Sequence, residues 1–366
     1  MSSYKILLLS PALEEVGGVS VFAQTLIEFL NPEFVVDHFQ IGNRPGNRNP
    51  FKQIFFFLHD GKELKKRLKE KAYDVVHLNP SFRILSLLRD SYYLSRINKQ
   101  TAGKALVLFH GWDEFLAARI QKNILLRRLF RCIYGKARLL TVLCRSFKDS
   151  LVKMGIPAEM ISVVTTMYRE GHIPAKDSKH ADRDSVQVLF MGRLFKSKGP
   201  YVAAEAAKIL LENGNRVRFV LAGEGPEYVG LQKYIQDHGL AEYVSLPGNI
   251  VGEEKKNILR SSDIFVLPSV GEGCPIALLE AMGSGLAVVS TPVGAVPDII
   301  EQEKNGLLVK TCSGKSFSQA VLRLIKDKNL LRRMQSLNRK EAKQSYSAEV
   351  VTRKIESLYS SIIHDK

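Results

Sequence analysis

A chain of 366 residues with 45% hydrophobic residues is long enough for more than one hydrophobic core, since a single domain usually holds about 100–200 residues. No run of about 18 uncharged apolar residues occurs, and residues 1–5 lead directly into an apolar strand pattern, so we expect neither a membrane span nor a signal peptide. The four cysteines are far apart in the sequence, which argues against a zinc site or a disulfide framework and favours reduced thiols in the cytoplasm.

The charge is strongly basic and unevenly distributed. The formal net charge is +16, and residues 1–168 hold 25 Lys and Arg against 14 Asp and Glu. This surplus predicts an anionic partner for the N-terminal half, either a phosphate-bearing molecule or a lipid surface. We expect no nucleic acid among the partners, because the basic stretches lack the aromatic residues of RNA-binding motifs and no zinc or basic-zipper signature occurs.

Short apolar runs recur along the chain, and most of them are separated by amphipathic stretches of helical length. They span residues 6–9, 75–78, 105–109, 139–143, 161–164, 186–190, 217–222, 264–267 and 287–289. Strands that are apolar on both faces and alternate with helices are typical of parallel sheets covered on each side. The sequence therefore predicts an α/β fold built from doubly wound parallel sheets.

The polar stretch 169–185 contains Pro174, lacks apolar periodicity and is the predicted linker between domains. It divides the chain into two Rossmann-like domains, residues 1–168 and 169–347, and we expect them to face each other across a cleft lined by the carboxyl ends of both sheets. The amphipathic segment 348–366 is expected to return to the first domain.

Residues 266–291, VLPSVGEGCPIALLEAMGSGLAVVST, predict a strand, a glycine-rich loop and a helix that begins near Pro275. The free N–H groups from Cys274 to Ala277, together with the positive end of the helix dipole, would then form a phosphate site. Glu272 and Glu280 flank this helix start and would repel a diphosphate, so we expect them to accept hydrogen bonds from sugar and ribose hydroxyls. The alternative makes Glu280 an ordinary surface residue and Glu272 a turn residue.

A second strand-to-loop stretch, residues 188–199 (VLFMGRLFKSKG), supplies Arg193 and Lys198. Negative charge develops on a leaving nucleoside diphosphate, and a site without a metal ion must offset it with fixed cations. Arg193 and Lys198 fit this role, although a basic residue after a strand is also common without any function.

These motifs resemble the family 4 retaining glycosyltransferases of the GT-B fold. The spacing of Glu272 and Glu280, the GRL segment with a following KG, and the LAGEGP turn at 221–226 carry the resemblance, while residues 163–168 depart from the family pattern. The resemblance implies that Arg193 and Lys198 hold the donor diphosphate, Glu280 the ribose, Glu272 the sugar, and residues 248–251 the nucleobase, with no metal ion and no cofactor. The substrate-binding residues predicted in this half are Gly248, Ile250, Val251, Gly273, Cys274, Pro275, Ile276, Ala277 and Glu280.

The N-terminal half keeps two matching features. Gly17 and Gly18 open a predicted helix after the first strand, where a bare backbone can approach a phosphate or an acceptor, although a plain tight turn is the alternative. His110 follows an apolar strand, and the resemblance implies that it lies beside the donor sugar and assists transfer. A buried structural histidine is the competing interpretation.

The basic segment 122–138 predicts an amphipathic helix with Leu126, Leu129, Phe130 and Ile133 on one face and arginines around it. Such a helix either lies on an anionic bilayer or packs into the core with a cationic exterior, and the pattern favours neither strongly.

Taken together, these features predict a retaining, metal-independent glycosyltransferase located in the cytoplasm and peripheral on the inner face of the cell membrane. It would move a hexose or N-acetylhexosamine from a nucleoside-diphosphate sugar, with UDP favoured, to a glycan or lipid-linked saccharide during cell-surface polysaccharide assembly. The alternatives are a nucleotide-sugar epimerase or phosphorylase of the same architecture, or a catalytically inactive partner subunit.

Overall fold

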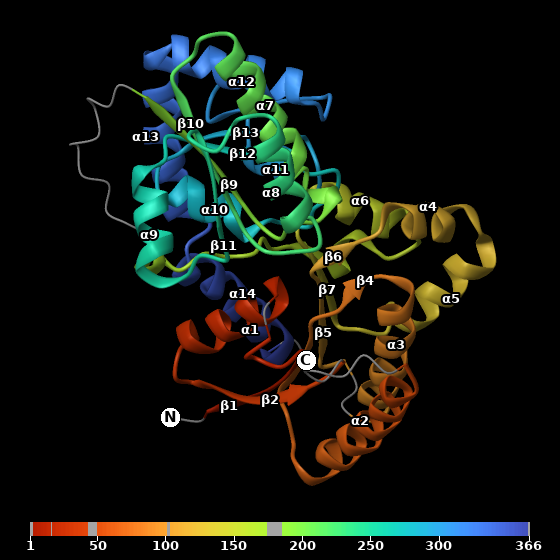
Figure 1. Ribbon diagram of the computed structural model, residues 1–366. Coiled ribbons are helices and arrows are strands. Elements are labelled where there is room, and N and C mark those ends of the chain that lie inside the picture. The colour runs from red at the N-terminus through yellow and green to blue at the C-terminus, as the bar shows by residue number, and fades with distance from the viewer. Residues whose placement is uncertain (1–2, 16, 43–49, 101–102, 174–184, 365–366) are drawn as a thin grey trace. The chain divides into compact units, whose positions relative to one another are not determined.

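The computed structural model describes residues 3–15, 17–42, 50–100, 103–173 and 185–364, and the chain divides into two compact units (Figure 1). The first unit comprises Met1–Thr166 and Ala348–Lys366, and the second comprises Met167–Ser347. The boundary after Thr166 thus lies two residues before the predicted domain boundary after residue 168. Of the predicted linker 169–185, the structure describes 169–173 and 185, and these described residues belong to the second unit.

The first unit contains a six-stranded parallel sheet in the order β2-β1-β3-β5-β7-β8. The strands are β1 (Tyr4–Ser10), β2 (Phe34–Gln40), β3 (Val75–Leu78), β5 (Ala105–Phe109), β7 (Leu139–Val142) and β8 (Ile161–Val163). A separate pair is formed by β4 (Ser81–Phe82) and β6 (Gly111–Trp112). Because all six main strands run parallel, their carboxyl ends meet at one edge of the sheet.

Helices connect these strands, as parallel pairing requires. They are α1 (Gly18–Phe29), α2 (Pro50–Glu70), α3 (Ile84–Gln100), α4 (Glu114–Lys122), α5 (Ile124–Tyr134), α6 (Arg145–Lys153) and the 3₁₀ turn η1 (Ala158–Met160). The C-terminal helix α14 (Ala348–His364) packs on α1 and β3 through an apolar face that includes buried Ile355 and Tyr359. The Tyr359 hydroxyl lies 2.7 Å from Nδ1 of His77 in β3.

The second unit repeats this architecture with the strand order β11-β10-β9-β12-β13-β14, again all parallel. Its strands are β9 (Val186–Met191), β10 (Val217–Ala222), β11 (Val244–Gly248), β12 (Ile264–Leu267), β13 (Ala287–Ser290) and β14 (Gly306–Leu308). Its helices are η2 (Glu170–His172), η4 (Lys196–Lys198), α7 (Pro200–Glu212), α8 (Tyr228–Asp237), α9 (Gly252–Ser261), α10 (Ile276–Gly283), α11 (Val296–Ile299), α12 (Gly314–Lys326) and α13 (Lys328–Ser345). The sequence prediction of doubly wound parallel sheets is confirmed.

Both sheets are covered on each face by helices, which explains why their central strands are buried throughout. Strands β5, β12 and β13 have no exposed residue. Among the residues that the structure describes, no helix is long and apolar enough to cross a membrane.

Candidate functional site

The loops that follow β9 and β12 in the second unit bring Lys198 and Glu272 together. Lys198 Nζ lies 2.6 Å from Glu272 Oε2, and the Ser269 hydroxyl donates to Oε1 at 2.6 Å. The side chain of Glu272 is 8% exposed and that of Lys198 is 23% exposed. The carboxylate is therefore fixed from both sides, and the sequence interpretation had missed the contribution of Ser269.

Glycine allows these two loops to touch. Gly199 has a φ of +73°, and a Cβ atom at this position would collide with the carbonyl oxygen of Pro268. Next to this contact, the backbone N–H of Val270 donates to the carbonyl of Ser197 at 2.9 Å. Only glycine fits here, and the close approach places Lys198 against Glu272.

Helix α10 begins where the sequence predicted, with Pro275 as its N-cap residue and no side-chain cap. Ile276 and Ala277 form its first turn and are partly exposed, whereas Cys274 is buried and Gly273 is partly exposed. The carbonyl of Gly273 accepts from the N–H of Ala295 at 2.8 Å, which fixes the loop ahead of the helix. An uncapped helix start at the carboxyl edge of a parallel sheet presents N–H groups and a positive dipole end to an anion.

Glu280 lies in α10, and its carboxylate accepts from Lys255 Nζ at 2.6 Å. The side chains are 9% and 21% exposed, respectively. The interpretation of Glu280 as an ordinary surface residue is wrong, because this side chain is buried and paired. Lys255, in α9, was not predicted as a site residue, since the charged run of Glu253 to Lys256 is typical of a solvated helix face.

Arg193 differs from Lys198 in being exposed and in having no ion-pair partner among the described residues. Its guanidinium lies 5.3 Å from the centre of the Phe195 ring. The N–H of the intervening Leu194 donates to the carbonyl of Glu224 at 2.8 Å, which joins the loop to the LAGEGP turn. Arg193 is therefore free to bind an anion.

The residues predicted to border a nucleobase follow β11 in the same unit. Gly248 ends the strand with a φ of +81° and accepts from the N–H of Gly223 at 2.7 Å. Ile250 is buried, whereas Val251 is exposed and precedes the first residue of α9.

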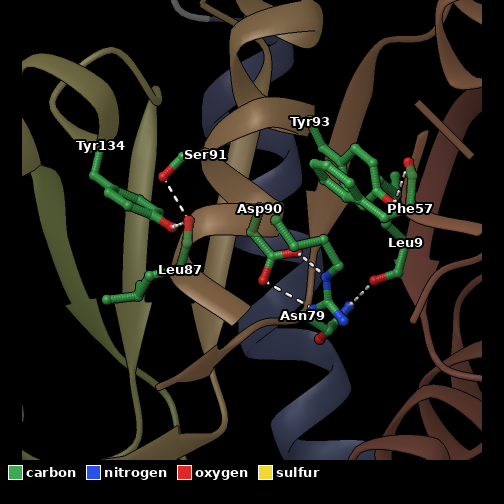
Figure 2. Close-up of polar contacts among 9 residues, drawn as sticks. Leu9, Phe57, Asn79, Leu87, Asp90, Ser91, Tyr93 and Tyr134 are labelled. Atoms are coloured by element: carbon green, nitrogen blue, oxygen red, sulfur yellow. Dashed lines mark hydrogen bonds and ion pairs between the residues drawn. The ribbon is translucent and has the colours of Figure 1, made fainter. Parts of the chain in front are cut away.

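In the first unit, His110 follows β5 and is buried against the edge of the Phe22 ring, at 4.6 Å between centroids. Its Nε2 lies 2.7 Å from Oδ1 of Asn79. The Nδ2 of Asn79 donates in turn to the Leu9 carbonyl at 3.3 Å (Figure 2). Because an amide oxygen only accepts, Nε2 carries the proton and Nδ1 keeps its lone pair. Burial lowers the pKa of His110 to about 3, so the ring is neutral at physiological pH.

Gly17 and Gly18 lie at the start of α1, with Gly17 as its N-cap residue. The φ of Gly17 is 178°, an extended conformation that any residue adopts, and a Cβ atom at either position would meet no described atom within 4 Å. The backbone conformation and the local packing thus do not require glycine at these two positions.

Helix α3 carries the buried ion pair of Arg89 and Asp90, with nitrogen-to-oxygen distances of 2.8 and 3.0 Å (Figure 2). Asp90 is fully buried and accepts both bonds from its neighbour in sequence. The negative charge of Asp90 is thus compensated by the positive charge of Arg89. The same helix is tied to α5 by the Tyr134 hydroxyl, which donates to the Leu87 carbonyl at 3.2 Å.

Helices α3, α4 and α5 also expose large apolar side chains. Leu85 of α3 is 78% exposed, Phe115 of α4 is 92% and Leu125 of α5 is 70%. Helix α5 contacts both α3 and α4. The predicted apolar face of α5 is divided, because Phe130 is buried while Leu129 is exposed. Exposed cations, among them Arg119, Lys122, Arg128 and Arg131, lie on α4 and α5.

The comparisons with known proteins bear on the second unit first. Residues 174–341 match the sequence profile described as glycosyl transferases group 1. The matched segment is therefore similar to the group 1 glycosyl transferases. The uncapped start of α10 and the Lys198–Glu272 pair both lie within these matched residues.

Two curated relatives extend the similarity beyond the matched segment. The amylovoran biosynthesis glycosyltransferase AmsK of Erwinia amylovora is 32% identical over 62% of this chain and 56% of the relative. The UDP-Gal:alpha-D-GlcNAc-diphosphoundecaprenol alpha-1,3-galactosyltransferase of Escherichia coli is 27% identical over 83% of this chain and 79% of the relative. The chain therefore spans little more than half the length of the Erwinia transferase.

A solved structure supports the assignment of the fold. Alr3699/HepE of Anabaena, in complex with UDP and glucose, superposes with a TM-score of 0.72 at 16% identity, covering 98% of this chain and 100% of that one. At this identity the likeness shows the fold, and it confirms the predicted GT-B architecture of two parallel-sheet domains.

Proposed function

We propose that the chain is a retaining, metal-independent glycosyltransferase of cell-surface polysaccharide assembly. It transfers a hexose or N-acetylhexosamine from a UDP-sugar to a glycan or lipid-linked saccharide. The family of residues 174–341 supports transferase chemistry, and the names of the relatives support a polysaccharide pathway and a lipid-diphosphate-linked acceptor. The HepE complex with UDP and glucose favours UDP as the donor nucleotide.

The observation that carries the proposal is the Lys198–Glu272 pair in the loop that leads into the uncapped start of α10. During transfer, the bond between the anomeric carbon and the diphosphate oxygen breaks, and the electron pair leaves with the diphosphate. Lys198, Arg193 and the N–H groups of Ile276 and Ala277 would offset this charge. The proton of the attacking acceptor hydroxyl would pass to a diphosphate oxygen.

Glu272 and His110 would orient the reacting sugar without exchanging a proton. An ionised carboxylate has about four acceptor positions, so Glu272 can still accept from sugar hydroxyls while Lys198 and Ser269 donate to it. His110 is neutral and keeps one lone pair on Nδ1, which suits it to accept a hydrogen bond from a hydroxyl.

A donor screen tests the proposal. The thermal unfolding midpoint is measured with UDP-, GDP- and ADP-sugars, and the sugars that bind are then incubated with and without a lipid-linked saccharide. We expect stabilisation by a UDP-sugar and extension of the acceptor by one sugar with retained anomeric configuration, in the presence of EDTA. Conversion of the donor without an acceptor would instead indicate an epimerase, and stabilisation by none of the nucleotides would contradict the proposal.

We further propose that α3, α4 and α5 hold the first unit on an anionic bilayer. The exposed Leu85, Phe115 and Leu125 would enter the interface, while each cation near the surface adds about 1 kcal/mol of attraction that salt weakens. An anionic bilayer fits both the apolar side chains and the basic residues on these helices. A bilayer is also where an acceptor linked to a lipid would be found.

Flotation with phosphatidylglycerol liposomes tests this surface. Wild type should float at low salt and less at high salt, and the double variant Leu125→Ser/Leu129→Ser should float several-fold less. Val229→Ser, in α8 of the second unit, is the matched control because Val229 is 75% exposed. Equal flotation of the double variant and the control would contradict membrane binding through α5.

A further inference from the structure

Lys255 stands apart from the neighbouring cations of α9. Its side chain is 21% exposed, and its Nζ lies 2.6 Å from Glu280 Oε1 on another helix, whereas Lys256 pairs at 2.7 Å with Glu253, three residues away on the same helix. Glu253 is 74% exposed, so the Lys256 pair is a surface contact. The Lys255–Glu280 pair instead joins two elements through a buried carboxylate.

The pair repeats the arrangement at the other acid of the motif. Glu272 holds Lys198 at 2.6 Å, and Glu280, eight residues later, holds Lys255 at the same distance. Each carboxylate is thus matched by one lysine from a different part of the chain. Because Lys198 belongs to the loop after β9 and Lys255 to the helix after β11, the two lysines can act on different portions of one ligand.

The location of Lys255 indicates which portion of the ligand it acts on. Its backbone N–H donates to the carbonyl of Val251, one helical turn earlier, at 3.4 Å. Val251 precedes α9 and is among the residues proposed to border the nucleobase. Lys255 therefore projects from the turn that follows the proposed base site, toward the carboxylate proposed to bind the ribose.

We propose that Lys255 is a positioning residue for recognition of the nucleotide ribose, an inference that rests on the proposed function. By donating to Oε1, the ammonium group holds the Glu280 carboxylate in one orientation. Oε2 accepts from no residue that the structure describes, so the carboxylate keeps three acceptor positions, enough for both hydroxyls of a ribose diol. Without Lys255 the carboxylate would lose its fixed orientation, and the ribose hydroxyls would then contribute much less to the binding affinity of the nucleotide.

Binding of UDP and of its 2′-deoxy and 3′-deoxy analogues, measured by calorimetry, tests this role. A hydrogen bond to a charged group gives about ten- to a hundredfold in affinity, so wild type should lose that factor when the relevant hydroxyl is removed. Lys255→Met should bind UDP about tenfold more weakly and lose little further with the deoxy analogues. Lys256→Met is the matched control and should behave like wild type, while Lys255→Arg should recover part of the affinity.

The outcomes separate the two proposals. If Lys255→Met binds UDP as tightly as wild type, or binds it more weakly but keeps the full penalty for a missing hydroxyl, then Lys255 does not act through the ribose and the inference fails alone. If wild type binds none of UDP, GDP and ADP, the proposed function fails and takes this inference with it.

Discussion

The two sheets are both six-stranded and parallel, but their carboxyl edges differ in the charge of their polar residues. In the first unit, His110 and Asn79 follow two strands and share one hydrogen bond between neutral groups at 2.7 Å. In the second unit, the corresponding edge carries two lysine–glutamate pairs at 2.6 Å. The fold thus sets where polar side chains gather, while the residue types decide what they bind: charges suit a diphosphate and its diol, and a neutral ring suits a hydroxyl.

The largest expected effect concerns the charged edge, the carboxyl edge of the second sheet with its two lysine–glutamate pairs. Lys198→Ala should lower the rate of sugar transfer about a hundred- to a thousandfold, about 3–4 kcal/mol, because it removes a cation from the leaving diphosphate. Steady-state kinetics with the donor identified by the screen provide the measurement. Lys208→Ala is the control, since Lys208 makes only a surface pair with Glu212 at 3.8 Å. Near-equal rates for the two variants would show that the charged edge is structural.

A smaller effect, on stability, distinguishes a glycine required by the close approach of two loops from a glycine required only by its positive φ. Gly199 and Gly214 both have a φ of +73°, but only Gly199 meets a neighbouring backbone, at Pro268. Gly214→Ala should therefore cost about 1 kcal/mol of unfolding free energy, and Gly199→Ala about 3 kcal/mol. Denaturation followed by far-UV circular dichroism gives both values. Equal losses would mean that the loop carrying Lys198 is not held by this contact.

The buried neutral histidines of the first unit predict that the free energy of unfolding depends on pH. Burial lowers the pKa of both His110 and His77 to about 3, against 6.5 for a free histidine, so the folded chain binds fewer protons than the unfolded one. Stability is then complete above about pH 6.5 and is lost as the pH falls toward 3. Each histidine should account for about 2 kcal/mol between pH 7 and pH 5.

Trp112, the single tryptophan, lies in the first unit, so its fluorescence during urea unfolding follows that unit. His110→Asn should remove one histidine's share of the difference between pH 7 and pH 5. An unchanged difference would contradict the assignment of a buried neutral ring to His110.

The strands that the sequence predicted and those that it missed differ in burial. Strands such as β5 and β12 coincide with the predicted runs, because they are buried on both faces and read as continuous apolar segments. The missed β2 and β11 lie at sheet edges, where partial exposure mixes polar residues into the strand. The missed β14 also lies at an edge, and its three residues are too few to form a recognisable apolar run. A pattern of apolar residues cannot separate such strands from loops.

The residues of the candidate site also differ in how far the sequence marks them. Glycine, proline and the spaced glutamates marked the loop and helix of residues 271–280, since their positions in sequence are local. Ser269 lies three residues from its partner Glu272 but belongs to no distinctive motif. Lys255 contacts Glu280 only because the fold brings these residues of α9 and α10, 25 positions apart in sequence, close together. Likewise, Asn79 meets His110 only when β3 and β5 pair. These partners are fixed by tertiary structure, and the sequence alone carries no signal for them.

The smallest expected effect is at Gly17, in the first unit. Its extended backbone and the open space around a Cβ atom predict that Gly17→Ala changes the unfolding free energy by no more than about 0.5 kcal/mol, measured by Trp112 fluorescence. If the glycine serves instead to let a phosphate or an acceptor approach the start of α1, the same variant should lower transfer activity several-fold. If the variant loses more than about 1 kcal/mol of unfolding free energy while its activity is unchanged, Gly17 is a turn residue. The carboxyl edges of the two sheets would then differ in ligand binding as well as in charge.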